Sequence, residues 1–222
     1  GFFEAGWAQS DSEVGAASGD GDHDYYGLGT AMRYTFETPF YLDASARLGW
    51  ATTDFSGRYQ TDQARYDADS FYGSLHMGLG WIYSISESLN LDVYGRYILT
   101  YLHGDEVDLG TKNNEELGMD DTTTHAFRVG FRLNGIFSEQ ATWRVGLAYE
   151  HVADGDAESD VHSPEDIVAL DDPSLEGDTG ILDLGFVFRP SPTNPWSMKV
   201  GLKGYVGDRE GVSGNAILTY TF

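Results

Sequence analysis

The last eleven residues, Val212 to Phe222, place their aromatic and most of their apolar side chains two residues apart. This period is that of a β-strand, in which successive side chains point to opposite faces, and it argues against a helix. An edge strand that showed two aromatic rings to water would be an aggregation hazard, whereas a bilayer accommodates such rings at the headgroup level. The pattern therefore favours a membrane-crossing strand over the final strand of a soluble β-sandwich. Its apolar face consists of Gly214, Ala216, Leu218, Tyr220 and Phe222.

Nine earlier segments show the same period of two, which predicts an antiparallel sheet of ten strands. Four long acidic connections, at 10–24, 53–69, 104–121 and 153–177, alternate with short turns that fall at the end of the sheet where the chain finishes. Short turns at one end and long loops at the other are typical of an antiparallel outer-membrane β-barrel, with the short turns and the C-terminus periplasmic and the long loops extracellular. The predicted strands are 1–9, 25–36, 41–52, 70–83, 89–103, 122–136, 141–152, 178–189, 196–206 and 212–222.

The charged residues of these segments support a barrel in a bilayer. Each predicted strand has an apolar face and a polar face. The apolar face, which would contact lipid, carries no charge at mid-strand, and a cation there would cost about 2–4 kcal/mol at the bilayer midplane. Most of the 36 acidic residues lie in the long connections. Nine of the 13 basic residues lie on the polar strand faces, which in a barrel face the lumen: Arg33, Arg47, Arg96, Arg128, Arg132, Arg144, Arg189, Lys199 and Lys203.

Composition excludes several functions. A formal net charge of -23 argues against nucleic-acid binding. The absence of cysteine rules out a disulfide framework, a thiol catalyst and a zinc–thiolate site. The sequence contains no run of about 18 apolar residues, so no transmembrane helix is predicted. It also contains no nucleotide-binding motif and no evident cofactor site. The length of 222 residues suits a single barrel domain spanning 1–222.

Several blocks resemble the translocator β-barrel domain of classical autotransporters, the proteins of type V secretion. The resemblance implies an outer-membrane anchor and conduit for an N-terminal passenger, without enzymatic activity. Barrels of that family have twelve strands threaded by a linker helix, so the ten strands here would lack the first two strands, the helix and the passenger. A complete ten-stranded relative is the alternative. The resembling blocks are 89–97 (LNLDVYGRY), 125–132 (HAFRVGFR), 145–151 (VGLAYEH), 172–180 (DPSLEGDTG), 207–214 (GDREGVSG) and the terminal Tyr220-Thr221-Phe222.

The resemblance also implies partners and site residues. The passenger and linker helix, the barrel-assembly machinery, and outer-membrane lipid and lipopolysaccharide are the expected partners. The terminal strand resembles the signal that the assembly machinery reads, and its apolar face up to Phe222 would carry that signal. The lumen charges would either pair with one another or grip the linker helix, with Arg96, Arg128 and Arg132 as the foremost helix contacts. The full set is Arg33, Arg47, Arg96, Arg128, Arg132, Arg144, Glu150, Asp183, Lys199 and Lys203.

Other candidate sites are weaker. The Asp-x-Asp patterns 20–24 and 154–156 lack the register of a calcium loop and are interpreted as a solvated acidic surface, so no metal site is predicted. His103 with Asp105, and His151 with Asp154, could supply the acid–histidine pair of an omptin-like outer-membrane protease. His76, in mid-strand, is expected to be a hydrogen-bonded lumen residue. A stand-alone barrel that acts as porin or adhesin through its acidic loops is the other alternative function.

Overall fold

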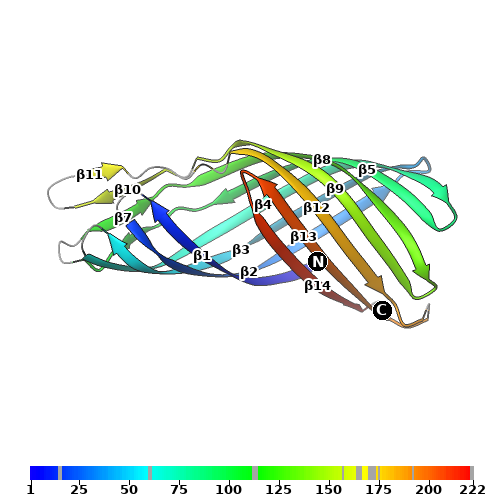
Figure 1. Cartoon of the computed structure of the whole chain (residues 1–222), viewed down its shortest axis with the longest axis horizontal. Helices are drawn as coiled ribbons and strands as arrows, with labels where there is room; N and C mark the ends of the chain where they lie inside the picture. The colour runs from blue at the N-terminus through cyan, green and yellow to red at the C-terminus, as the bar shows by residue number, and fades with distance from the viewer. Residues whose placement is uncertain are drawn as a thin grey trace.

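A computed structural model describes residues 1–222 except 15–16, 60–61, 112–114, 157, 164–166, 170–173, 175, 192 and 221–222. Within this part of the chain all regular structure is β, and no helix is both long and apolar enough to cross a membrane. Ten long antiparallel strands form one curled sheet in the order β1-β2-β3-β4-β5-β8-β9-β12-β13-β14, as predicted (Figure 1). Its strands are β1 (Phe2–Val14), β2 (Ala17–Thr35), β3 (Phe40–Tyr59), β4 (Asp62–Ser86), β5 (Leu89–Leu102), β8 (Thr122–Ser138), β9 (Ala141–Asp154), β12 (Gly177–Phe188), β13 (Trp196–Gly207) and β14 (Gly211–Tyr220).

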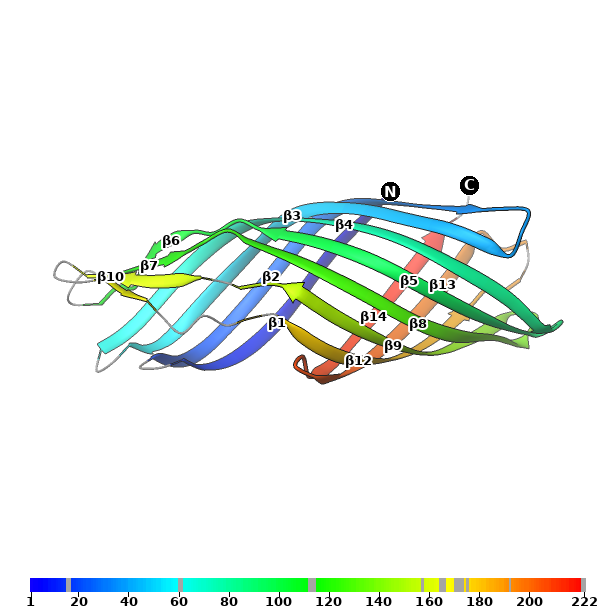
Figure 2. The same ribbon diagram turned by 90° about the horizontal axis from the view of Figure 1, so that it is seen from above.

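The two ends of the sheet differ, and we call them the turn end and the loop end. Short connections such as 36–39 and 87–88 close the hairpins at the turn end. The loop end carries the last described pairs of β1 with β2 and of β3 with β4, together with a small sheet in the order β11-β10-β7-β6, which lies at the same end in both views (Figures 1 and 2). The small strands are β6 (Glu106–Asp108), β7 (Glu116–Met119), β10 (Ser159–His162) and β11 (Ile167–Ala169).

The expectation that 10–24 and 53–69 are loops was wrong, because the residues of both segments that the structure describes extend paired strands. The pairing of β1 with β2 continues to Val14 opposite Ala17, and that of β3 with β4 continues to Tyr59 opposite Asp62. Each extension gains cross-strand hydrogen bonds from its neighbours, which overrides the low intrinsic strand preference of its Asp, Gly and Ser residues. The segments 104–121 and 153–177 are likewise partly structured, since they supply the small sheet.

A compact apolar cluster joins the small sheet to strand β4 of the main sheet. The backbone amide of Arg65 on β4 donates to the carbonyl of Leu109 at 2.9 Å, so the chain after β6 lies beside the extension of β4. Burial of this cluster holds the loop end together by the hydrophobic effect. Its members are Ala64, Ala68, Val107, Leu109, Leu117 and Val161.

The faces of the main sheet are the reverse of those of a water-soluble protein. Large apolar side chains stand exposed on the convex side, among them Met32, Met77 and Val129 at 57–69% exposure. The concave side buries polar groups instead, including Asp92, Glu150 and Asp183 at 2–6% exposure. A continuous exposed apolar surface of this kind is typical of a barrel whose outer face contacts lipid.

Aromatic rings border the apolar band on both sides. Tyr26 stacks on Trp50, which meets Phe71 edge-on, with ring centroids 6.1 and 5.7 Å apart. Near the turn end, Trp81 packs on Tyr83. Phe71 and Trp81 are ten residues apart on β4, about 23 Å along the membrane normal at about 3.3 Å per residue and about 45° tilt. That height agrees with the apolar band of about 25 Å in outer-membrane barrels.

Candidate functional site

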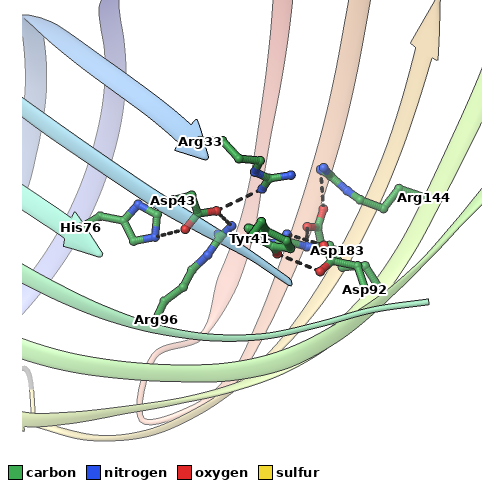
Figure 3. Close-up of polar contacts among 9 residues, drawn as sticks. Arg33, Tyr41, Asp43, His76, Asp92, Arg96, Arg144 and Asp183 are labelled. Atoms are coloured by element: carbon green, nitrogen blue, oxygen red, sulfur yellow. Dashed lines mark hydrogen bonds and ion pairs between the residues drawn. The ribbon is translucent and has the colours of Figure 1, made fainter. Parts of the chain in front are cut away.

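The inner wall of the curled sheet carries three linked groups of charged side chains. The first is centred on Asp43 of β3, whose Oδ2 accepts hydrogen bonds from Arg33 and Arg96, each at 3.0 Å (Figure 3). His76 Nε2 lies 3.3 Å from Asp43 Oδ1, and its Nδ1 lies 3.2 Å from Ser45 Oγ. The placement of His76 as a hydrogen-bonded inner-wall residue is therefore confirmed. Four strands, β2 to β5, are joined through this one carboxylate.

The second group continues the wall from β3 to β12. Tyr41 is fully buried and donates its hydroxyl to Asp92 Oδ1 at 2.8 Å. Arg132 lies between two carboxylates, 3.6 Å from Asp92 and 3.5 Å from Asp183. Arg144 donates to the other oxygen of Asp183 at 3.2 Å (Figure 3). Because each carboxylate of this group has a guanidinium group within 3.6 Å, the group stabilises the polar interior of the sheet.

A third group surrounds Glu150 of β9, whose side chain is only 3% exposed. Arg128 donates to Glu150 Oε2 through Nε at 2.7 Å and through Nη2, and Arg209 donates to Oε1 at 2.7 Å. Arg209 lies in the link between β13 and β14, so it reaches over β12 to its partner. Sequence analysis did not predict this contact, since Arg209 is not on any of the predicted strands. The flanking Gly207 and Gly211 have φ of 125° and 141°, a region that favours glycine.

The remaining predicted inner-wall residues are less constrained. Arg47 lies 3.6 Å from Glu4 of β1, which also accepts a hydrogen bond from Tyr72 at 2.8 Å. Lys199 and Lys203 share a face of β13, and Lys203 lies opposite Asp183 in the register of β12 and β13. Within the described residues, neither lysine has a carboxylate oxygen within 4.0 Å of its ammonium group. The structure thus pairs eight of the ten predicted residues and leaves the two lysines as spare cations.

Comparison with known proteins identifies the family. The sequence model described as Autotransporter beta-domain matches residues 3–202. The chain belongs to this family. Its predicted resemblance to autotransporter translocators is thereby confirmed, and the protein serves as an outer-membrane anchor and translocation domain.

Solved structures agree on the fold of this autotransporter β-domain. The β domain of the Bordetella autotransporter BrkA matches 99% of this chain and 92% of its own, with a TM-score of 0.63 and 10% identity. The transport unit of AIDA-I from Escherichia coli matches 99% of this chain and 89% of its own, with a TM-score of 0.52 and 12% identity. The curated proteins yielded no match. At such low identity the two structures show a shared architecture and nothing about individual side chains.

The predicted acid–histidine pairs of the β-domain have other partners than expected. His103 Nδ1 lies 2.6 Å from Asp121, not beside Asp105, and the hydroxyl of Tyr101 donates to the same carboxylate at 2.7 Å. His151 lies 2.8 Å from Asp178 rather than beside Asp154. The Tyr101 hydroxyl, followed by the amide of Gly104, lowers the pKa of Asp121. The same carboxylate contacts the imidazole of His103, whose side chain is 60% exposed.

The acidic patterns of the loop end form a ladder on the outer face. Asp22 lies opposite Asp54 in the register of β2 and β3, and Asp54 lies opposite Asp67 in that of β3 and β4. The hydrogen bond and charge of Asp67 raise the pKa of Asp54. Over the described residues, no three His, Asp or Glu side chains are arranged to hold a metal ion.

Four residues of the expected assembly signal, Gly214, Ala216, Leu218 and Tyr220, share the apolar face of β14. Gly214 pairs with Leu202, Ala216 with Val200, Leu218 with Met198 and Tyr220 with Trp196. Phe222 lies outside the described residues. The ring of Tyr220 meets that of Trp196 with centroids 4.9 Å apart, at the turn-end border of the apolar band.

Proposed function

We propose that the concave wall is the conduit face past which the passenger polypeptide moves, and that it then holds the linker helix of the same precursor. The observation that carries the proposal is the separation of charge: ion-paired arginines and carboxylates line the inside, and an uncharged apolar band covers the outside. Such a wall gives a threaded polypeptide polar contacts while the bilayer meets only apolar groups. The loop end faces outward and the turn end faces the periplasm in this proposal.

The whole of 1–222 acts as one translocator domain in this proposal. Within the described residues β1 and β14 form the two edges of the main sheet and do not pair with each other. An open edge is costly in lipid because its backbone groups lack hydrogen-bond partners. Two further strands that bridge β1 and β14 would satisfy those groups and complete a twelve-stranded barrel.

Strand β14 is the proposed recognition element for the barrel-assembly machinery. Its alternation and its position at a sheet edge support this role, because an edge can pair with another strand. Replacing Phe222 with Ser should reduce insertion into the outer membrane, measured as the heat-modifiable fraction on a gel. The rings at both borders of the apolar band would meet lipid and lipopolysaccharide headgroups.

We expect no enzymatic activity from this domain. The His103–Asp121 pair joins the chain that follows β5 to the residue that precedes β8, whereas the His151–Asp178 pair joins β9 to β12, and each is engaged with a neighbouring tyrosine hydroxyl. A mixture of peptides incubated with the purified barrel should therefore remain intact. Cleavage that is abolished in His103→Ala would instead support the protease alternative.

Shaving whole cells with an external protease tests the proposed function. Cells that express the native gene are treated, and the released peptides are identified by mass spectrometry. Release of a large fragment encoded upstream of the barrel, with the barrel left in the membrane, supports the translocator role. If peptides from the loop end alone are released, the barrel is a stand-alone porin or adhesin.

A further inference from the structure

On the inner wall, several of the arginine side chains are more exposed to solvent than the carboxylates with which they pair. The ion-paired carboxylates of Glu4, Asp43, Asp92, Glu150 and Asp183 are 3–18% exposed. Several of their cationic partners are far more exposed: Arg33 and Arg47 at 46%, Arg144 at 30% and Arg209 at 50%. The acids are thus covered by the guanidinium groups that pair with them. The inner surface therefore presents positive charge toward the lumen.

The number of charges adds to this bias. The three charge groups, the Arg47–Glu4 pair and the two lysines of β13 together comprise five carboxylates and nine cations, the cations being Arg33, Arg47, Arg96, Arg128, Arg132, Arg144, Lys199, Lys203 and Arg209. The excess stands in contrast to the net charge of -23 for the whole chain. A cleft with one sign of charge and low-dielectric walls concentrates ions of the opposite sign. The wall is therefore an electrostatic site for anionic groups.

We propose that the lumen binds acidic stretches of polypeptide, whose carboxylates pair with the exposed arginines and with the two lysines of β13. This inference rests on the proposed conduit function and specifies the chemistry of its occupant. Lys199 and Lys203 are four residues apart on one face, a spacing of about 13 Å in a strand. Arg33 and Arg47 are half exposed on β2 and β3, across the concave side of the curled sheet from β13. An acidic segment can thus be held from two sides.

Lys199 and Lys203 are the residues to substitute because neither forms an ion pair with any carboxylate in the part of the chain that the structure describes. Replacing both with Gln removes two positive charges while every pair around Asp43, Asp183 and Glu150 is retained. Arg58→Gln is the matched control, since Arg58 is exposed on the outer face of β3 near its loop end and its loss leaves the inner wall unchanged. Heat modifiability on a gel verifies that each variant has folded.

The experiment measures the reversal potential of the full-length protein in a planar bilayer under a KCl gradient. We expect chloride to be preferred over potassium, and the ratio of the two permeabilities to fall at least about twofold in Lys199→Gln/Lys203→Gln but not in Arg58→Gln. An octaglutamate peptide should block the current, more weakly in the double variant, and an octalysine peptide should not. Equal or greater permeability to potassium in the wild type overturns the proposal.

Two further outcomes separate the possible explanations. A preference for chloride without block by octaglutamate means that the lumen takes only small anions, which overturns the assignment of an acidic polypeptide. The conduit function itself is judged by release of passenger from shaved cells. A barrel that exports its passenger but shows no anion preference refutes this inference alone, whereas failure of export refutes the proposed function first.

Discussion

Two aspartates on the same strand, Asp43 and Asp54 of β3, have opposite surroundings. Asp43 points inward within the apolar band and accepts hydrogen bonds from Arg33 and Arg96. Asp54 points outward beyond the band, where Asp67 of the neighbouring strand shares a hydrogen bond with it and raises its pKa. On the inner wall the sheet thus pairs acids with cations, whereas on the outer face of the loop end it places acids beside one another.

The difference follows from the surrounding medium. In a low-dielectric wall an unpaired charge is expensive, so each inner-wall carboxylate has a cation beside it. At the loop end, water and salt screen charges over about 8 Å at physiological ionic strength, so an acidic ladder is tolerated. Tolerance is not stability, however, because facing like charges on adjacent strands destabilise their pairing. Substitutions of charged residues on the inner wall should therefore lower the stability of the barrel by a large amount. Removal of an acid from the ladder at the loop end should raise stability by a smaller amount.

The largest loss of folding free energy is expected from Glu150→Gln. The substitution retains the size of a side chain that is 3% exposed but leaves Arg128 and Arg209 without a counter-charge. Breaking a buried pair in this way costs about 3–5 kcal/mol of folding free energy. Unfolding by urea in lipid vesicles, followed by tryptophan fluorescence, measures it. Arg209→Gln, which removes only the half-exposed partner, is the control and should cost far less. Equal losses for the two variants would contradict a pairing role for Glu150.

A charge on the outer face of the same region should have the next largest effect. Met77 of β4 is 67% exposed in the middle of the apolar band, where the bilayer would cover it. Met77→Arg should lower the free energy of unfolding by about 2–4 kcal/mol, and Met77→Leu should leave it nearly unchanged. The vesicle unfolding assay applies again. An arginine tolerated as well as leucine would show that this face does not contact lipid.

The two substitutions above depend on which face of a strand each residue occupies, and this was predictable from the sequence. Lipid on one side and a polar lumen on the other would impose a strict period of two, which predicts Met77 on the apolar face and Asp183 on the polar face; their exposed fractions are 67% and 6%. Ten strands and their order follow from the same pattern. At the loop end no bilayer imposes the alternation, and segments such as 10–24, rich in Asp, Gly and Ser, were mistaken for loops although they form paired strands.

Partners were harder to predict than faces. Asp43 meets Arg33 and Arg96 from strands on either side of β3, and such contacts depend on the register between strands that no local pattern records. Arg209 was overlooked because it lies in a link and crosses a strand to reach Glu150. His103 was placed near Asp105 by sequence proximity, but the turn that precedes β8 brings Asp121 to it instead.

A smaller effect, of opposite sign, is expected for Asp54→Asn at the loop end. The raised pKa of Asp54 means that its ionised form is disfavoured in the folded hairpin. Its destabilising effect is therefore absent at low pH and develops as pH rises through the folded pKa, above the ordinary aspartate value. The variant should slow hydrogen exchange of residues 53–69 at neutral pH, after correction for intrinsic rates. As pH falls through the folded pKa of Asp54 the difference should shrink, because the wild-type carboxyl then becomes protonated and loses the charge that the variant lacks. Faster exchange in the variant at neutral pH would show that the acidic ladder stabilises the hairpin.

The smallest effect concerns Asp121, the loop-end acid that has donors rather than acids beside it. Its lowered pKa means that its contribution to stability is present above the ordinary aspartate pKa and is lost as pH falls through the folded value. The Tyr101 hydroxyl is the largest cause of this shift, ahead of the Gly104 amide and His103. In Tyr101→Phe the carboxyl carbon resonance of Asp121 should therefore titrate at higher pH than in the wild type, with a smaller change in His103→Gln. If His103→Gln produced the larger shift, the imidazole rather than the phenol would be the group that holds this carboxylate ionised.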